Sequence, residues 1–203
     1  EGHEVKIYNQ DMHHYPDEHL TGYIDKNKFD IVGISIIAGY FQYRKLLSLS
    51  KAINKCKNRP VVILGGHGPS PEPEFFFNKT KADIIVMGEG EETAKELFRA
   101  LQDHKSLKDI KGIAFRQDNE IFINPRRPLI KDIDSLPFPA WHLFPIEYYR
   151  LIRIGPHSSN KDFLMPVLSG RGCTYKCNFY YRMDTVVRPR SIKSVIEDMQ
   201  ILK

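Results

Sequence analysis

The sequence is poor in cysteine and contains no long apolar run. Its 203 residues include three cysteines, and so sparse and odd a count argues against a disulfide framework and for a reducing, cytoplasmic compartment. The longest apolar stretch, residues 31–38, is far shorter than the roughly 20 residues that a membrane-spanning helix needs. We therefore expect no membrane span. Because the chain opens with a polar segment and no initiator methionine, we also expect an internal fragment.

Two familiar signals of ligand class are missing as well. No Gly-x-Gly-x-x-Gly stands between an expected strand and an expected helix, which disfavours a nicotinamide cofactor. The net charge of +5 is too small to indicate a nucleic-acid partner by itself. Hydrophobic residues make up 41% of the chain and charged residues 27%, so a packed core can form.

What the first half does contain is an alternation of short apolar runs and helical patterns. The run over residues 30–36 is largely β-branched, as expected of a strand that is covered on both faces. Leu46, Leu49, Ile53 and Cys56 have helical spacing, and so do Ala94, Leu97, Phe98 and Leu101. Strands are predicted over residues 5–8, 30–36, 61–64 and 82–87. This order predicts an α/β fold with a mostly parallel sheet and right-handed crossovers.

The pattern changes after residue 105. Residues 112–116 and 120–123 flank Gln117-Asp118-Asn119, which is a hairpin signal. Prolines then interrupt residues 124–146 and oppose both helix and sheet, while the aromatic residues between them predict that this connector packs against a domain surface. We therefore expect a Rossmann-like domain over residues 1–105, a hairpin and connector over 106–160, and the start of a second domain over 161–203.

Small and polar residues stand where three of the predicted parallel strands end. In an open parallel sheet, ligands bind beyond the carboxyl ends of the strands, where the backbone must come close to them. Glycine has no Cβ to block that approach. These glycines could serve only tight turns, but agreement at three strand ends favours a ligand site. The candidate residues are Ser35, Gly65, Gly66, His67, Gly68, Gly88, Glu89 and Gly90.

Two cysteines follow a predicted strand over residues 163–169. Cys173 and Cys177 lie four residues apart in a glycine-bounded loop, and a helix with Ser191 as its N-cap is predicted over residues 191–202. Two thiols at this spacing can converge on one soft metal centre. A pair of reduced surface cysteines is the alternative, and the strand and the Gly-Arg-Gly-Cys context favour the metal centre.

The segment Ser169-Gly170-Arg171-Gly172-Cys173-Thr174-Tyr175-Lys176-Cys177-Asn178-Phe179 closely resembles the cluster loop of radical S-adenosylmethionine (SAM) enzymes. In that family three thiolates in a Cys-x3-Cys-x-aromatic-Cys pattern hold a [4Fe–4S] cluster, to which SAM binds. The resemblance implies that Cys173 and Cys177 are cluster ligands and that Phe179 lies near the adenine of SAM. The third ligand position is occupied by Tyr180, whose phenol oxygen is a poor ligand for cluster iron, which implies an impaired cluster.

The glycine turns and the connector segment Leu136-Pro137-Phe138-Pro139-Ala140-Trp141 resemble the cobalamin-binding class of these enzymes. This resemblance implies a flavodoxin-type cobalamin domain that is incomplete at its N-terminus, with cobalamin at the eight strand-end residues named above. It further implies a connector and the first βα unit of a radical SAM partial TIM barrel. The family's chemistry is cleavage of SAM to a 5′-deoxyadenosyl radical, here for methyl transfer to an unreactive carbon. The substrate would be a small molecule or natural product, and the electron donor a protein such as flavodoxin or ferredoxin.

Two other classes of function remain open. One is a non-catalytic corrinoid-binding module with a disabled cluster loop. The other is a nucleic-acid-binding protein, because basic residues alternate with aromatic ones near the cysteines; we favour a role of these residues in the cofactor loop or on a solvated face. The residues are Arg171, Lys176, Arg182, Arg188 and Arg190 among Tyr175, Phe179, Tyr180 and Tyr181. The segment Asp11-Met12-His13-His14-Tyr15-Pro16 begins like a cobalt-ligand motif but ends in proline. We expect His13, His14 and His19 to form a solvated polar loop.

Overall fold

The computed structural model describes residues 2–37, 39–151, 165–179, 182, 184 and 186–203. They divide into two compact units, which are described separately. The sheet unit comprises residues 16–130 and 177–183, and the connector unit comprises residues 1–15, 131–176 and 184–203. Among the residues described, no helix combines the length and apolar character needed to cross a membrane.

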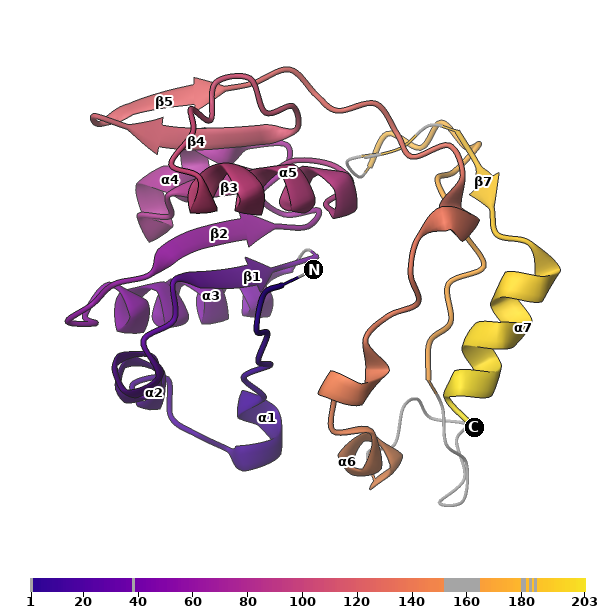
Figure 1. Ribbon diagram of the computed structural model, residues 1–203, viewed down its shortest axis with the longest axis horizontal. Helices are drawn as coiled ribbons and strands as arrows, with labels where there is room; N and C mark the ends of the chain where they lie inside the picture. The colour runs from indigo at the N-terminus through magenta and orange to yellow at the C-terminus, as the bar shows by residue number, and fades with distance from the viewer. Residues whose placement is uncertain (1, 38, 152–164, 180–181, 183, 185) are drawn as a thin grey trace. The chain divides into compact units, whose positions relative to one another are not determined.

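The sheet unit is built on five strands in the order β1-β2-β3-β4-β5 (Figure 1). The first three pair in parallel, whereas β4 runs antiparallel to β3 and β5 antiparallel to β4. The strands are β1 (Ile31–Ser35), β2 (Val61–Gly65), β3 (Ile84–Val86), β4 (Ile113–Gln117) and β5 (Glu120–Ile123). The predicted α/β class is confirmed, and the parallel part of the sheet is the part in which helices separate the strands.

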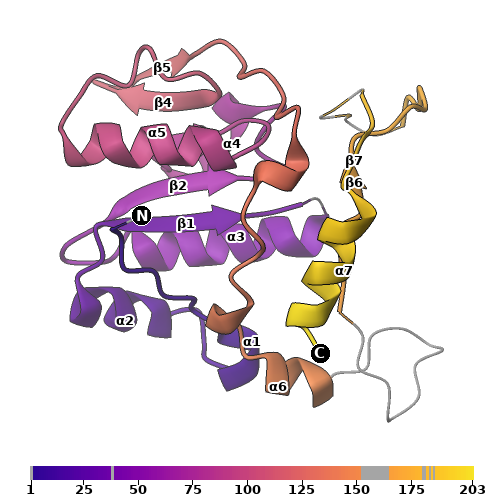
Figure 2. The same ribbon diagram turned by 45° about the vertical axis from the view of Figure 1, so that its right-hand side comes forward.

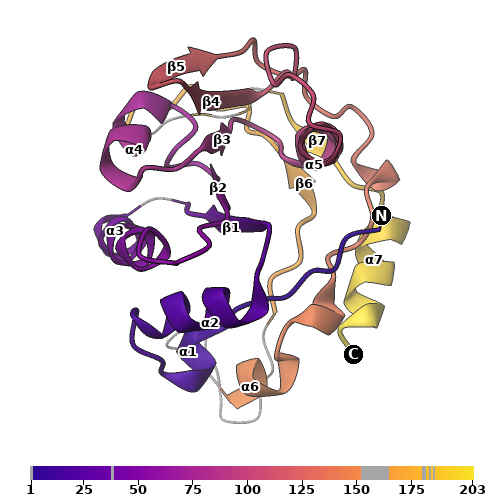
Figure 3. The ribbon, with the colours of Figure 1, turned by 60° about the vertical axis from the view of Figure 1, so that its left-hand side comes forward.

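Helices cover both faces of this sheet. Figure 3 shows α3 (Tyr40–Ile53) and α4 (Pro73–Thr80) on one side and α5 (Glu91–Gln102) on the other, while α2 (His19–Asn27) lies beyond β1 and contacts α3. The register places Gly33 opposite Ile63 and Ile63 opposite Ile84. Because paired residues in a sheet project to the same face, these three residues share one face, which is named the α5 face below.

The main core lies between α5 and the sheet. Leu97 from α5 is fully buried and packs with Ile84 and Phe115 of the strands. Phe98 and Leu101 pack at the margin of the same cluster, so the predicted apolar stripe of this helix is confirmed. Burying one such side chain contributes about 1.5–3 kcal/mol, and this contribution holds the helix against β2, β3 and β4.

Two sequence predictions about strands in this region are wrong. Residues 5–8 form no strand; Val5 is 60% exposed, because a strand forms only where another strand accepts its hydrogen bonds. The strand at residues 30–36 was expected to be covered on both faces, yet Gly33 and Ser35 are exposed. β1 is an edge strand, and α5 lies over the strands further into the sheet (Figure 3).

The predicted hairpin is confirmed, and it belongs to the sheet. Asp118 and Asn119, between β4 and β5, have φ of 51° and 66°, which is the pair of left-handed residues that a two-residue type I′ turn requires. The sequence groups this hairpin with the connector. In the structure Ile113 of β4 pairs with Val86 of β3, so the hairpin extends the sheet beyond residue 105.

The connector unit contains short elements, which Figure 2 shows around the last helix. They are α1 (Gln10–His13), η1 (Ile133–Ser135), η2 (Trp141–Leu143), α6 (Ile146–Leu151), β6 (Gly170–Arg171), β7 (Arg188–Pro189) and α7 (Ile192–Ile201). The strand predicted over 163–169 is wrong for residues 165–169, which are not in a strand; residues 163 and 164 lie outside the described part. In the described part of this segment, the two residues of β6 form a strand, because β7 pairs with those two residues.

The last helix begins at the predicted residue, but its buried side is not the predicted apolar one. Ser191 caps α7, and its hydroxyl accepts a hydrogen bond from Ser194 N over 3.1 Å. The predicted apolar stripe is largely exposed, with Ile192 at 80% and Met199 at 57%. Asp198 is instead 1% exposed, because the helix docks on the connector through a polar contact.

That contact confirms that the connector packs against the chain that follows it. The indole N–H of Trp141 donates to Asp198 Oδ1 over 3.0 Å. The guanidinium of Arg190 lies 5.6 Å from the centroid of the Phe138 ring, a cation–π distance. The aromatic residues of the proline-rich segment therefore fix it to α7 and to the turn before α7.

Candidate functional site

The loops that follow β1 and β2 are joined by backbone hydrogen bonds. Ile36 N donates to the carbonyl oxygen of Gly65 over 3.1 Å, and Gly68 N donates to the carbonyl oxygen of Ile36 over 3.3 Å. The predicted residues Ser35 and Gly65 to Gly68 are thus brought to one edge of the sheet. His67, between the glycines, is exposed.

Two of the predicted glycines are needed for this contact between loops. Gly66 has φ of +90°, and a Cβ there would overlap the carbonyl oxygen of Ile36 and lie 2.8 Å from Ser35 Oγ. A Cβ on Gly68 would lie 2.9 Å from the side chain of Ile36. At Gly66 and Gly68, the absence of a Cβ is therefore explained by close packing of the chain itself.

The loop after β3 combines an open glycine with an anchored carboxylate. Gly88 has φ of +82° and no atom within 4 Å of a Cβ built on it; Gly90, the N-cap of α5, is also uncrowded. The carboxylate of Glu89 accepts a hydrogen bond from Ile130 N over 2.7 Å. Glu89 thus ties the loop to the chain that leaves β5, while Gly88 leaves its backbone accessible.

Ser70 joins the second and third loops, and the sequence gives no signal for it. The side chain is 3% exposed. Its hydroxyl donates to the carbonyl oxygen of Gly66 over 2.7 Å and accepts from Gly88 N over 3.4 Å. One buried hydroxyl therefore fixes the spacing of two predicted site loops.

The α5 face carries an open strip at the ends of β1 and β2. Gly33, Ser35 and Gly65 share this face by register; the first two are exposed and Gly65 is half-buried. No atom lies within 4 Å of a Cβ built on Gly33. These three residues, named the open strip below, form a flat, nearly side-chain-free surface against which a large ligand can lie. Gly33 was missed, although a glycine inside a strand is a recognised sign of close backbone approach.

The cysteine loop begins with a tight contact to β7. A Cβ on Gly170 would lie 3.0 Å from the carbonyl oxygen of Arg188, and a Cβ on Gly172 (φ +86°) would overlap the carbonyl oxygen of Val186. Cys173 and Cys177 are half-buried and are not joined in a disulfide. They fall in different units, so each thiol is described by itself.

The other predicted residues of that loop are Phe179 and Tyr180. Phe179 is 83% exposed, and Tyr180 lies outside the described residues. Burial, together with the nearby charge of Asp25, raises the pKa of the Cys56 thiol, which favours the protonated form over the thiolate that binds metal. In the part of the chain that the structure describes, no three His, Cys, Asp or Glu side chains gather to hold a metal ion.

The three histidines near the start of the chain stand on its surface. His13, His14 and His19 are exposed, and the ring of His13 stacks on Tyr15 at 5.0 Å between centroids. The predicted exposure is confirmed, but the predicted loop is wrong at two of the three positions, because His13 ends α1 and His19 begins α2.

Comparison with known proteins points to one family. Residues 1–98 match the family model described as the B12 binding domain. The chain is 30% identical over 207 residues to the Uncharacterized methyltransferase PH0819 of Pyrococcus horikoshii, with 100% of this chain and 43% of the relative covered. It is 29% identical to the anaerobic magnesium-protoporphyrin IX monomethyl ester cyclase of Rubrivivax gelatinosus, over 86% of this chain and 31% of that protein. The chain thus spans less than half the length of these curated relatives.

The fold recurs in a solved enzyme. The radical S-adenosylmethionine methyltransferase TsrM from Kitasatospora setae matches with a TM-score of 0.73 and 19% identity, over 99% of this chain and 40% of that one. TsrM has also been solved with cobalamin and a [4Fe–4S] cluster bound. At this level of identity the likeness concerns the fold.

Proposed function

We propose that this chain binds a corrinoid along the open strip. The premise is that it contains a B12 binding domain and is related to cobalamin-dependent radical SAM methyltransferases. Gly33, Ser35 and Gly65 carry this proposal, because Ser35 and Gly65 end two paired parallel strands and Gly33 continues the same face along β1, with Gly33 and Ser35 exposed. A corrin is large and flat, and a Cβ-free backbone lets it approach closely.

The surrounding loops fit the same ligand. Gly88 presents accessible backbone at the end of β3. Ser70 fixes this loop against the loop that contains Gly66, so the ligand would meet a preformed edge. A preformed site loses less conformational entropy on binding than a flexible one.

The cysteine loop supports only part of the family's chemistry. When bound, a [4Fe–4S] cluster with SAM supplies radical chemistry, and cobalamin carries the methyl group. Cys173 and Cys177 offer two thiolates where the resemblance requires three, and residue 180 is tyrosine. This donor set does not fit a cluster that needs three thiolates. We therefore propose that the chain is the corrinoid-binding part of a radical SAM methyltransferase, in which Tyr180 weakens cluster retention.

A titration with hydroxocobalamin tests the corrinoid site. The wild-type chain should bind and change the visible spectrum of the corrinoid. Gly33→Leu should reduce the affinity for the corrinoid by about 100-fold, because the leucine side chain would occupy the space in which the corrin lies. This factor corresponds to a loss of about 2.7 kcal/mol of binding free energy. Gly22→Leu is the matched control, since Gly22 lies on α2 with no atom within 4 Å of its Cβ position. Equal binding by both variants would refute the open strip as the site.

Reconstitution with iron and sulfide tests the cluster loop. Tyr180→Cys should retain about four iron atoms per chain with the absorption of a [4Fe–4S] cluster, and the wild type should retain few. Tyr181→Cys is the control for an added thiol at the wrong position. If Tyr180→Cys retains no more iron than Tyr181→Cys, the corrinoid-binding module without a cluster is the better description. The electron donor of the methyltransferase would be a small protein such as flavodoxin or ferredoxin.

A further inference from the structure

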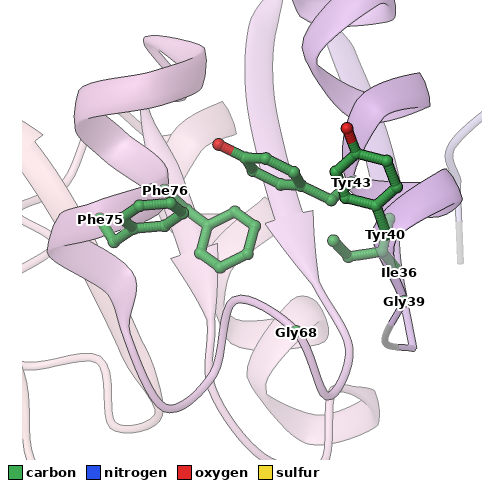
Figure 4. A pocket seen from close by; sticks show the side chains of 7 residues that line it. All are labelled: Ile36, Gly39, Tyr40, Tyr43, Gly68, Phe75 and Phe76. Atoms are coloured by element: carbon green, nitrogen blue, oxygen red, sulfur yellow. The ribbon is translucent and has the colours of Figure 1, made fainter.

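A second surface of the sheet unit is a shallow, open hollow lined by aromatic residues. It has a volume of about 380 Å³ and lies between the first turns of α3 and α4 (Figure 4). This surface is named the aromatic hollow. Its lining residues are Ile36, Gly39, Tyr40, Tyr43, Gly68, Phe75 and Phe76.

The walls of the hollow are aromatic rings at steep angles to one another. The rings of Tyr43 and Phe76 lie 6.1 Å apart at 90°, and those of Phe75 and Phe76 lie 5.4 Å apart at 81°. Tyr40 is 67% exposed and Phe75 44% exposed. Such an arrangement offers both ring faces and ring edges to a flat ligand, and leaves an apolar surface that a ligand can cover.

Each of the two exposed rings has a cation against it. The guanidinium of Arg44 lies 5.8 Å from the centroid of Tyr40, and the ammonium of Lys79 lies 5.8 Å from the centroid of Phe75. Within residues 2–37, 39–151 and the other described segments, neither cation pairs with a carboxylate. An anionic group at the edge of a bound ring would therefore find positive charge on both sides of the hollow.

The hollow is separate from the open strip. Gly33, Ser35 and Gly65 lie on the α5 face, whereas α3 and α4, which form the hollow, cover the opposite face (Figure 3). Ile36, the residue after Ser35, contributes to the hollow. The space beside Gly39, which also lines the hollow, is open, because no atom lies within 4 Å of a Cβ built on this residue.

We propose that the aromatic hollow binds a flat, apolar ring system that carries an anionic group, at a site distinct from the corrinoid site. The rings of Tyr40 and Phe75 contact the flat part of the ligand, and Arg44 and Lys79 attract its charge. This proposal goes beyond the proposed function and holds whether or not the chain binds a corrinoid.

Two fluorescent probes with the same rings test it. 8-Anilinonaphthalene-1-sulfonate is the anion, and N-phenyl-1-naphthylamine is its neutral counterpart. The variant Tyr40→Ala/Phe75→Ala should bind the anion about 10-fold more weakly, as expected for the loss of two aromatic contacts of about 0.5–1.5 kcal/mol each. Phe41→Ala is the control, because Phe41 is 86% exposed beside Tyr40 but does not line the hollow.

The charge is tested with a second variant. Arg44→Gln/Lys79→Gln should weaken binding of the sulfonate about 3- to 10-fold and leave the neutral probe within about 2-fold, the range of exposed charge interactions. Far-UV circular dichroism establishes that each variant is folded. The proposal is overturned if Phe41→Ala weakens binding as much as Tyr40→Ala/Phe75→Ala, if the charge variant affects both probes equally, or if hydroxocobalamin displaces the sulfonate. Probe binding by a chain that does not bind hydroxocobalamin would refute the proposed function alone.

Discussion

Trp141 and Asp198 are joined by a hydrogen bond of 3.0 Å from the indole N–H to Oδ1. The second oxygen of the same carboxylate lies 2.8 Å from Arg190. The side chain of Asp198 is 2% exposed and that of Arg190 9% exposed. One buried carboxylate thus fastens the proline-rich connector and the turn before α7 to each other.

Removing this carboxylate should destabilise the connector unit. In Asp198→Ala the guanidinium of Arg190 stays buried without its partner, and breaking such a pair costs about 3 kcal/mol. Trp141 is the single tryptophan of the chain and lies in the connector unit. Urea unfolding followed by tryptophan fluorescence therefore reports the stability of this unit. Glu197→Ala is the control on the same helix, because its pair with Lys193 is long and exposed. Equal midpoints for the two variants would contradict the prediction.

Loss of the Ser70 hydroxyl should loosen the loops of the corrinoid site. Ser70→Ala leaves Gly66 O and Gly88 N without their shared partner, at a cost of about 1–3 kcal/mol. Urea unfolding followed by far-UV circular dichroism gives the change in stability, and a hydroxocobalamin titration should show weaker binding. Ser106→Ala, which removes an exposed hydroxyl, should change neither quantity.

Two glycines with positive φ separate backbone strain from steric overlap. Gly66→Ala and Gly88→Ala both place a Cβ at a φ that L-residues avoid, at about 1–3 kcal/mol each. Only at Gly66 does the new Cβ overlap the carbonyl oxygen of Ile36, so Gly66→Ala should lower the free energy of unfolding by clearly more than Gly88→Ala. Thermal unfolding of the two variants side by side gives the comparison. The assigned role of Gly66 is incorrect if Gly88→Ala is the more damaging change.

Asp134 should contribute stability that is lost in acid. Hydrogen bonding to Ser191 holds the pKa of this carboxyl below its ordinary value of 3.8, and Ser191 N donates to both carboxylate oxygens over 3.2 and 2.9 Å. A carboxyl whose pKa is lowered by folding stabilises the fold fully above 3.8, and this contribution disappears as the pH falls through the lowered folded value.

The variant Asp134→Asn should therefore lose less stability between about pH 5 and pH 2 than the wild type does. Unfolding monitored by Trp141 fluorescence across this range is the measurement. Asp118→Asn is the control, because Asp118 lies in the turn between β4 and β5 of the sheet unit, at a positive φ that asparagine also adopts. A curve for Asp118→Asn as flat as that for Asp134→Asn would show that the effect does not arise at the cap of α7.

Local patterns in the sequence predicted the elements that depend on neighbouring residues. The β-branched runs gave β1 to β3, Asp118 and Asn119 marked the hairpin turn, and Ser191 marked the start of α7. The strand predicted over residues 5–8 failed because an extended run becomes a strand only with a partner. The same reason limits the strand before the cysteine loop to β6.

The candidate site was only partly predictable. The strand-end glycines were found, and the structure explains Gly66 and Gly68 by packing against Ile36. Gly33 and Ser70 were missed. Gly33 matters because it is exposed on its face of β1. Ser70 matters because its hydroxyl bonds both to Gly66 O and to Gly88 N, which lies 18 residues further along the chain. Neither relationship is visible in the local sequence.

By itself, then, the sequence determined the alternation of strands and helices, the hairpin turn, the cap of α7 and the positions of the two thiols, because periodicity, turn chemistry and spacing act over a few residues. The tertiary structure alone decided that Gly33 of β1 is exposed, and that Asp198 is buried while Ile192 is exposed. Burial depends on which distant segments meet a surface, and a single stretch of sequence does not specify that meeting.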